Sequence, residues 1–486
     1  MKGVSDLLII LSILLPIAGA IAAFKMKDDK QRHKLTAAAV ILSSVLAVVT
    51  ALTGIGSSVT IMNISERLSV TFAVDEISVF FIVLVSFIWC FVQFHAFGYM
   101  VHEGKEGQFF GFFLLTYAAL VMLAMAANAV TMYMCFELMT LCSMPLVLHN
   151  GTEVSRSAAL KYLGYSTLGA ALALMGFFLL YNGCASMDFV PGGVQLTGDE
   201  GLLLTAAFLT VIGFGCKAGM VPLQMWLTEA HPVAPSPASA VLSGLITKGG
   251  VIAIIRSVFY LFGAEFIQGT WVQTAVLVLS VITVFTGSML ALREKLLKKR
   301  LAYSTISNVS YVLFGLFTFT AAGFAGALLQ VVFHALAKDV LFLAAGSVIF
   351  ATGYTKVDEL KGVGRRMPVT MWCFAIAALS LIGIPPAGGF VAKWYLAVGA
   401  LESGAVLNTV GVVVLMVSAL LTAFYLLPIV ADAFFPGKEF VSEERIKEVG
   451  ANMLVPVVVF CVLIIVLGIL PSGMSGWFAA LAGKLM

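Results

Sequence analysis

Long apolar runs, each close to the length of a membrane-crossing helix, make up most of the sequence. An α-helix needs about 20 predominantly apolar residues to cross the hydrocarbon core of a bilayer. In lipid the backbone must satisfy its own hydrogen bonds, which a helix does within one segment. The runs therefore predict an all-α polytopic membrane protein with about fourteen transmembrane helices, at residues 5–24, 36–57, 76–98, 108–126, 128–149, 157–182, 202–222, 237–262, 271–291, 301–320, 323–351, 369–400, 405–434 and 452–471.

The composition of the chain is that of a protein embedded in lipid. Of the 486 residues, 61% are hydrophobic and 11% are charged, and the mean hydropathy is +1.05. Soluble domains have about 25% charged residues. The net charge of +3 is too small and too dispersed to indicate a nucleic-acid partner. Because no loop is long enough to fold separately, residues 1–486 are predicted to form a single membrane domain.

Lysine and arginine are concentrated in alternate loops of the predicted topology. If the N-terminus lies outside, the odd-numbered loops are cytoplasmic and carry most of the positive charge, as at 25–34, 293–300 and 356–366. The opposite loops at 183–201 and 263–270 contain no lysine or arginine. Cytoplasmic loops of membrane proteins are enriched in these residues. We therefore expect a multi-pass protein of a prokaryotic cell membrane (the inner or plasma membrane) with both termini outside.

Two clusters of proline and glycine interrupt predicted helices at membrane depth. The first contains Pro222, Pro232 and Pro235, and the second contains Pro385 and Pro386. Proline removes a backbone donor and clashes with the preceding turn, so a helix cannot continue unbent. Irregular backbone at this depth is tolerated only inside protein or beside a water-filled cavity. We predict that the seventh and twelfth helices are broken, a spacing that indicates an inverted-repeat transporter with its site near the breaks.

Ionisable residues stand inside five of the apolar runs, namely Glu137, Lys217, Lys248, Lys338 and Lys393. An ionisable group at bilayer depth costs about 2.5–3.5 kcal/mol on insertion scales. Such costs, repeated along one chain, indicate a pathway for charge. We expect Glu137 to pair with Lys217, so that closing and opening the pair changes the proton affinity of the lysine. A static ion pair that joins two helices is the alternative interpretation.

Lys248 and two residues of a later run extend this pathway. Glycines flank both Lys217 and Lys248, which leaves room for another helix or for water. His334 and Lys338 are four residues apart and so share a face of their helix. Neutral imidazole can both accept and donate a proton, so the two residues could form successive steps of a relay. Asp339 lies on another face and receives no role.

Residues near the helix breaks are candidates for the ends of the pathway. Lys393 follows the second break and is the candidate exit on that side. Glu229 and His231 lie at the first break, where they could connect the buried residues to the cytoplasmic side. Lys161 is a supporting candidate, and snorkelling of its side chain to the membrane surface is the alternative interpretation.

The cysteines and histidines do not form a metal or redox motif. No two of the seven cysteines form a CxxC pair, and most lie inside apolar runs, as small buried hydrophobic residues do. Ligation of an iron–sulfur cluster needs closely spaced thiolates. The chain has only six histidines. We therefore predict no metal, no cofactor and no catalytic redox site in this chain.

Several segments together resemble a known family. The run GFGCKAGMVPLQMWLTEAHPVAPSPASAVLSGLITKGGVIAIIR follows FELMTLCSMPL and precedes FHALAKDVLFLAAG and GIPPAGGFVAKWYL. In this order they resemble the antiporter-like membrane subunits shared by respiratory complex I, Mrp sodium/proton antiporters and energy-converting membrane-bound hydrogenases. The resemblance covers almost the whole chain, and the motifs are most similar to those of the hydrogenase and Mrp members.

This resemblance implies two inverted five-helix repeats, formed by helices 4–8 and 9–13, with helices 7 and 12 broken. It divides the chain into helices 1–3, the first repeat, the second repeat, and helix 14 with the C-terminus, at residues 1–107, 108–262, 271–434 and 452–486. It also implies the roles of the buried residues. The fifth-helix glutamate is Glu137, and the lysines of helices seven, eight, eleven and twelve are Lys217, Lys248, Lys338 and Lys393.

These observations predict a proton-translocating subunit of a larger membrane complex. It would couple redox chemistry or counter-ion flow in its neighbours to ion movement along the buried residues. The predicted partners are the lipid bilayer and the other membrane subunits of a hydrogenase, Mrp or complex I-like assembly. A self-sufficient secondary cation/proton antiporter and a membrane scaffold are the alternatives. Lysines and one glutamate do not distinguish protons from sodium ions, so sodium/proton exchange stays open.

Overall fold

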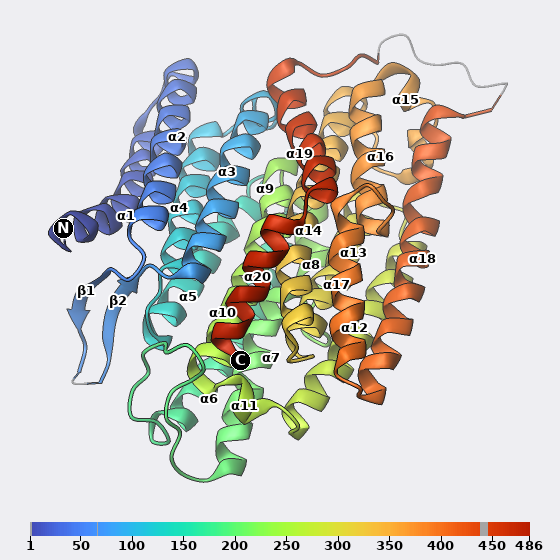
Figure 1. Cartoon of the computed structure of the whole chain (residues 1–486). Helices are drawn as coiled ribbons and strands as arrows, with labels where there is room; N and C mark the ends of the chain where they lie inside the picture. The colour runs from blue at the N-terminus through green and yellow to red at the C-terminus, as the bar shows by residue number, and fades with distance from the viewer. Residues whose placement is uncertain (1, 66, 438–445) are drawn as a thin grey trace.

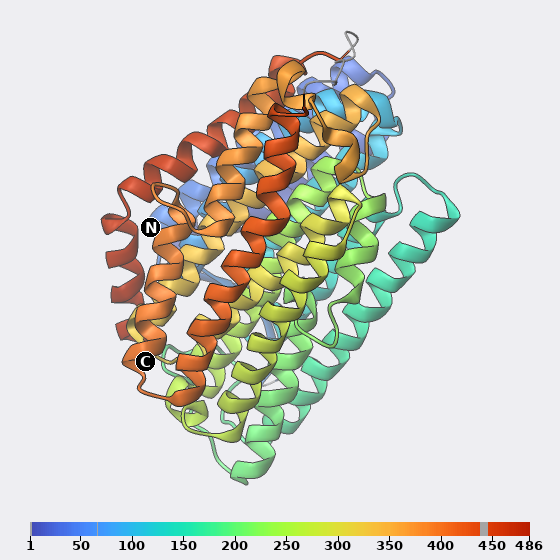
Figure 2. The same ribbon diagram turned by 90° about the vertical axis from the view of Figure 1, so that its right-hand side faces the viewer.

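The computed structural model describes residues 2–65, 67–437 and 446–486 as a bundle of tilted helices that run roughly alongside one another (Figure 1, Figure 2). Within these residues, twelve helices are long and apolar enough to cross a membrane. They are α1 (Lys2–Lys25), α2 (Asp29–Thr53), α3 (Glu76–Glu103), α4 (Glu106–Ala124), α5 (Ala129–Val147), α6 (Glu153–Tyr181), α7 (Glu200–Ala218), the continuous helix of α9 (Ser236–Val241), η1 (Leu242–Ile246), α10 (Thr247–Ile255) and η2 (Arg256–Phe262), α12 (Trp271–Arg293), α14 (Ala321–Thr352), α18 (Val406–Phe434) and α19 (Ala451–Ile469).

The remaining helices complete the predicted set of spans. The predicted span at 301–320 is α13, which is too polar to qualify by composition alone, and the span at 369–400 is the pair α16 and α17. The prediction of an all-α polytopic protein with about fourteen spans is thereby confirmed. The bounds of the other helices are α8 (Met225–Val233), α11 (Ala264–Ile267), α13 (Leu297–Leu316), η3 (Val357–Leu360), α15 (Val363–Arg366), α16 (Pro368–Ile382), α17 (Gly388–Glu402) and α20 (Ser472–Leu485).

A short β-hairpin departs from the helical prediction. β1 (Ser58–Asn63) pairs antiparallel with β2 (Ser69–Ala73), with Val59 opposite Phe72. The hairpin connects α2 to α3 at the edge of the bundle (Figure 1). Its valine, isoleucine and threonine residues favour strands. At 6 and 5 residues, the strands are too short to appear in a search for runs of membrane-spanning length.

Both predicted helix breaks are present. α7 ends before residues 219–224, and the chain resumes as α8; α16 ends before residues 383–387, and the chain resumes as α17. Pro222 lies in the first break, and Pro385 and Pro386 lie in the second. Each long span is therefore replaced by two shorter helices, and Pro222, Pro385 and Pro386 at the breaks are exposed on the bundle.

The prediction is wrong for Pro232, which lies inside α8. Pro232 lies in the last turn of that helix, one residue before its end at Val233. Its missing N–H removes one backbone hydrogen bond, and the helix continues to its end without a break. Pro235 lies at the boundary between α8 and α9 and precedes the first turn of α9. The first proline cluster therefore covers one break and one helix-to-helix junction.

Two helices are enclosed on all sides by the rest of the bundle. In the apolar stretch of α14 and in that of Ser236–Phe262, 100% of the residues are buried. The corresponding share is 33–72% in the other candidate spans. A charged group on a lipid-facing helix meets hydrocarbon, whereas one on an enclosed helix can meet other polar groups. The enclosed helix Ser236–Phe262 also contains the π-helical segments η1 and η2, a form that is frequent at functional sites.

The loops with the highest positive charge lie at one end of the molecule. The connection from α1 to α2 and the segment around α15 are both at the upper end in Figure 1. The marked N- and C-termini both lie away from that end (Figure 1). The arrangement of the loops is thus compatible with the alternation of charge along the sequence.

Candidate functional site

Lys217 lies in the last turn of α7, directly before the first helix break, and is 0% exposed. Its ammonium group donates to Thr140 Oγ1 at 2.9 Å, to Tyr162 OH at 2.8 Å and to Ser166 Oγ at 3.0 Å. These hydroxyls, from α5 and α6, can satisfy all the N–H donors of a protonated lysine. The ring centroids of Tyr162 and Trp226 lie 4.2 and 5.4 Å from Nζ, which adds cation–π attraction. The site is therefore built to hold a charged ammonium group.

Glu137 does not form the direct ion pair with Lys217 that the sequence suggested. Among the described residues no salt bridge joins them, although their charges interact over a longer distance. Glu137 instead lines a cleft of about 400 Å³ on the outer side of α5, beside Phe72, Tyr133 and Leu141. The carboxyl group therefore faces outward from the bundle, while the lysine faces inward.

Lys248 and His334 connect the two halves of the chain. Lys248 on α10 and His334 on α14 are each 1% exposed, and Lys248 Nζ lies 2.5 Å from His334 Nδ1. Lys248 also donates to Ser243 O of η1 at 2.8 Å. The other imidazole nitrogen, Nε2, has no hydrogen-bond partner among the described residues. An ammonium donor facing an imidazole acceptor allows one proton to be shared between two bases.

Lys338 lies one turn beyond His334 on α14 and is 0% exposed. Its ammonium group donates to Leu301 O at 2.9 Å and to Ser304 Oγ, both on α13. His334 and Lys338 are therefore both buried, but they contact different helices, α10 and α13. This arrangement carries the row of polar groups across α14 from one neighbour to the other.

Lys393 reaches back across the second helix break. It lies on α17, yet its Nζ donates to Leu381 O at 2.6 Å and to Ile382 O at 2.8 Å, which are carbonyls at the end of α16. The C-terminal carbonyls of a helix carry partial negative charge and favour a cation. Lys217 precedes its break in sequence and Lys393 follows its own. Lys217 itself lies at the end of the first half of its broken helix, and the ammonium group of Lys393 reaches the end of the first half of the other.

The supporting candidates divide between the surface and the interior. Lys161 and Glu229 form an ion pair of 3.0 Å, with side chains 49% and 33% exposed, so they meet at the surface. His231 is fully buried and its ring stacks on Phe342 with centroids 4.7 Å apart. Neither ring nitrogen has a hydrogen-bond partner within the described residues, and the charges of Lys298 and Lys338 act on the imidazole. Of the three residues, only His231 faces the row of buried lysines.

Glycines near the lysines allow close helix packing. A Cβ atom added at Gly213 would lie 2.4 Å from Gly169 O on α6, and one added at Gly250 would lie 2.7 Å from Phe214 O on α7. These positions therefore accept only glycine without a backbone shift. The space that the glycines leave is occupied by neighbouring helices. α7 and α10, which carry Lys217 and Lys248, consequently pack in backbone contact.

Arg256 and Asp339 are two of the buried charged residues that lie outside the pathway that the sequence suggested. Arg256 of η2 donates to both carboxylate oxygens of Asp75, at 2.8 Å to Oδ1. Asp75 is also the N-cap of α3, where it accepts from the Ser78 N–H at 2.9 Å. Its position before an apolar run is the usual signal for a cap. The pair ties α3 to η2. The second residue is Asp339, which is 0% exposed on α14.

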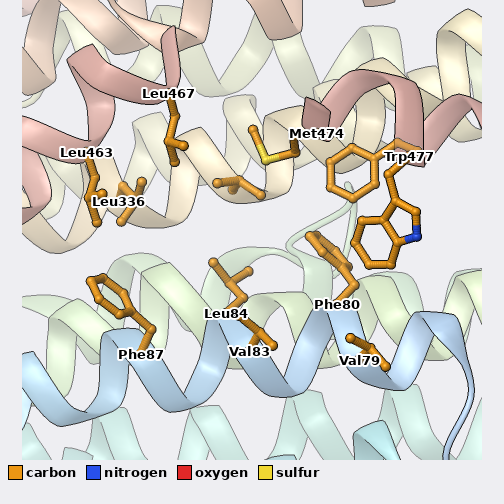
Figure 3. A pocket seen from close by; sticks show the side chains of 12 residues that line it. Val79, Phe80, Val83, Leu84, Phe87, Leu336, Leu463, Leu467, Met474 and Trp477 are labelled. Atoms are coloured by element: carbon orange, nitrogen blue, oxygen red, sulfur yellow. The ribbon is translucent and has the colours of Figure 1, made fainter. Parts of the chain in front are cut away.

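A separate cleft with apolar walls lies beside α14. Figure 3 shows this cleft, which has a volume of about 340 Å³ between α3, α14, α19 and α20. Its lining includes Phe80, Leu84, Phe87, Leu336 and Trp477. Because no ionisable side chain lines it, the cleft offers an ion no binding group. No group of three or more His, Cys, Asp or Glu side chains with metal-site geometry occurs within the described residues.

The fold and the site define a polytopic membrane protein with four buried ionisable groups, Lys217, Lys248, His334 and Lys338, and a half-buried lysine, Lys393, on its two broken helices and on the two enclosed helices. We call the residues Lys217, Lys248, His334, Lys338 and Lys393 the lysine axis. The sequence profile described as NADH:quinone oxidoreductase/Mrp antiporter, TM, matches residues 126–422, which include the whole axis. A second profile, NADH-Ubiquinone oxidoreductase (complex I), chain 5 N-terminus, matches residues 62–110. The chain belongs to this NADH:quinone oxidoreductase/Mrp antiporter family.

Individual relatives come from several branches of the family. The chain is 33% identical to NADH-quinone oxidoreductase subunit N of Desulforudis audaxviator, over 82% of this chain and 81% of that protein. It is 32% identical to hydrogenase-4 component B of Escherichia coli, over 68% of this chain and 51% of that longer protein. A chain in the structure of the Mrp complex from Dietzia sp. shares the fold, with a TM-score of 0.86 at 20% identity, covering 99% of this chain and 97% of that chain.

Proposed function

We propose that this protein is a proton-translocating subunit of a multi-subunit membrane complex, and that protons move along the lysine axis. The contact between Lys248 Nζ and His334 Nδ1, at 2.5 Å, carries this proposal. It joins the two halves of the chain through a pair of bases inside two fully enclosed helices. Burying an ammonium group in the membrane costs free energy. A neighbouring base can accept its proton, so the charge can pass along the axis instead of remaining on one lysine.

The side chains on either side of this contact can pass protons as well. Tyr162 OH, which accepts from Lys217, lies 2.6 Å from Ser143 Oγ. On the far side, Lys338 donates to Ser304 Oγ. A hydroxyl both donates and accepts, so it can relay a proton without holding a charge. Lysines that store the charge and hydroxyls that connect them are the components of a relay.

The exposure of Glu137 supports a subunit over a self-sufficient antiporter. Its carboxyl group lies in the middle of α5, in a cleft open to the outside of the bundle. An ionisable group facing lipid at this depth is unfavourable. A neighbouring subunit covering α5 would supply a polar environment, and the relatives above are named as a subunit and a component of larger assemblies. The proposed partners are therefore other membrane subunits of a hydrogenase, Mrp or complex I-like complex.

Orientation and internal repeats form part of the same proposal. The alternation of charge supports an orientation with both termini outside, and the bacterial relatives named above support a prokaryotic cell membrane as the location. Two breaks with a lysine at each, Lys217 and Lys393, support a division into related units at 108–262 and 271–434. In this arrangement Lys248 and His334 lie where the two units meet.

Substitution at the central contact tests the proposal. Lys248→Met and His334→Leu remove one partner each, and Lys27→Met on an exposed loop is the matched control. The assembled complex is reconstituted in vesicles, and proton and sodium movements are measured separately. We expect both axis variants to assemble and to lose proton translocation, while the control keeps it. Loss of assembly would favour the scaffold interpretation. Full transport by the purified chain alone would favour a self-sufficient antiporter.

A further inference from the structure

Asp339 differs from the other buried charged residues on and beside the lysine axis. Its side chain is 0% exposed on α14, and neither carboxyl oxygen has a hydrogen-bond partner in residues 2–65, 67–437 and 446–486. No salt bridge to it occurs in the part of the chain that the structure describes. Lys248 and Lys338, in contrast, both have acceptors. An isolated carboxylate in the interior costs several kcal/mol, so this group needs either a counter-charge or a bound proton.

The carboxyl group of Asp339 packs against the π-helical segment η1. A Cβ atom added at Gly244 would lie 2.3 Å from Asp339 Oδ2, so only glycine leaves space for the carboxyl group. The adjacent residue, Ser243, accepts the hydrogen bond from Lys248 Nζ at 2.8 Å. Asp339 and Lys248 therefore contact consecutive residues of the same segment. Their charges interact, although the two side chains share no hydrogen bond.

Asp339 is the sole acidic side chain on α10, α13, α14 and α16. The charged group that acts on it is Lys248 of α10; His334 and Lys338 lie on the same helix, and His95 of α3 contacts that helix farther along, with Nε2 3.3 Å from Ser347 Oγ. His95 is itself fully buried, and its Nδ1 has no partner among the described residues. Asp339 is thus a buried acid whose nearest charged neighbour is the base Lys248.

We propose that Asp339 is a second proton acceptor for Lys248, so that Lys248 can deliver a proton either to His334 or to Asp339. This inference rests on the proposed translocation along the lysine axis. The lysine stem has four flexible carbons, which allows Nζ to move from the imidazole toward the carboxylate. In the transfer an N–H bond of the ammonium group breaks and an O–H bond forms on Asp339, and the bonding pair stays on the nitrogen.

The transfer leaves a neutral amine and a neutral carboxyl group in place of two charges. Both products are favoured in a low-dielectric interior, and the neutral amine can then accept the next proton. The protonated carboxyl group becomes a donor as well as an acceptor. Asp339 therefore gives the axis a site that stores a proton without storing positive charge.

Asp339→Asn tests this role because an amide of the same shape cannot bind the proton. Asp339→Leu also removes the isolated carboxyl group, and Glu106→Gln is the matched control, since Glu106 is a buried acid paired with His33 at 2.5 Å away from the axis. We expect both Asp339 variants to assemble with an unfolding midpoint that is unchanged or higher. Their proton translocation per assembled complex should fall below that of the wild type but stay above that of Lys248→Met, because His334 still accepts a proton from Lys248. Glu106→Gln should instead lower the midpoint and leave the rate unchanged.

Infrared difference spectra give a readout that a structural role would not change. The carbonyl band of a protonated carboxyl group should appear during turnover of the complex and be absent in Asp339→Asn. Translocation at the normal rate in Asp339→Asn, with loss in Lys248→Met, would overturn this inference and leave the proposed function standing. Normal rates in both variants would overturn the proposed function itself. A loss confined to sodium movement would also overturn the inference, because the carboxylate would then bind a metal ion.

Discussion

Replacing Lys217 with methionine separates a role in transport from a role in stability. The change removes three hydrogen bonds from the ammonium group, to Thr140, Tyr162 and Ser166. Two of these hydroxyls keep another partner, because Thr140 Oγ1 also donates to a carbonyl of its own helix and Tyr162 OH lies 2.6 Å from Ser143 Oγ. Ser166 loses the one hydrogen-bond partner that its side chain has among the described residues.

The expected change in the free energy of unfolding follows from opposing contributions. Each hydrogen bond to a charged donor contributes about 1.5–3 kcal/mol, and a stranded buried hydroxyl costs about 1–3 kcal/mol. Burial of the ammonium group, however, carries a desolvation penalty of several kcal/mol, which methionine does not incur. Replacing buried charges by apolar side chains of similar volume is often neutral or stabilising by about 1–4 kcal/mol. We therefore expect a net change below about 2 kcal/mol.

Transport should respond quite differently, because methionine cannot bind a proton. The assay is the initial rate of proton uptake by vesicles that contain the assembled complex, together with its thermal unfolding midpoint. We expect translocation to be abolished in Lys217→Met. Lys161→Met is the matched control, since exposed ion pairs such as Lys161–Glu229 contribute only about 0–1 kcal/mol. A large fall in midpoint with a normal rate per complex would refute the reasoning and assign Lys217 a structural role.

Two further predictions concern charged groups away from the axis. Asp75→Asn leaves Arg256 buried without its counter-charge, and it should lower the free energy of unfolding by about 3–5 kcal/mol; an unchanged thermal midpoint would contradict this. Outside the membrane-spanning segments, hydrogen bonds from the N–H groups of Lys356 and Thr355 lower the pKa of Glu359. Because the folded pKa lies below the unfolded one, this stabilisation is present above the ordinary value and is lost as the pH falls through the lowered pKa. The two amides should lose exchange protection on acidification in the wild type but not in Glu359→Gln.

Membrane spans and their breaks could be predicted because each depends on a continuous stretch of sequence. A run of about 20 apolar residues must be helical in lipid whatever surrounds it, and the paired breaks follow from local proline chemistry at Pro222 and Pro386. Local reasoning failed where a feature was short or near a helix end. The β-hairpin at 58–73 lacks the length of a span, and Pro232 is accommodated in the last turn of α8.

The candidate site could be predicted in its residues but only partly in its contacts. Lys217, Lys248, Lys338 and Lys393 are conspicuous because a charge within an apolar run is costly wherever the helix packs. The direction of Glu137 was not predictable, since the outward or inward face of α5 depends on how that helix is rotated against its neighbours.

By itself, the sequence determined that the chain crosses a membrane many times, where two of its helices break, and which ionisable residues lie at bilayer depth. These properties depend on the cost of placing each segment in hydrocarbon. Only the tertiary structure decided which groups meet. The contact of Lys248 with His334 joins residues that are 86 positions apart, and the carboxyl group of Asp339 against Gly244 depends on how two enclosed helices are rotated. Packing of side chains between helices sets these rotations, and no single segment contains that information.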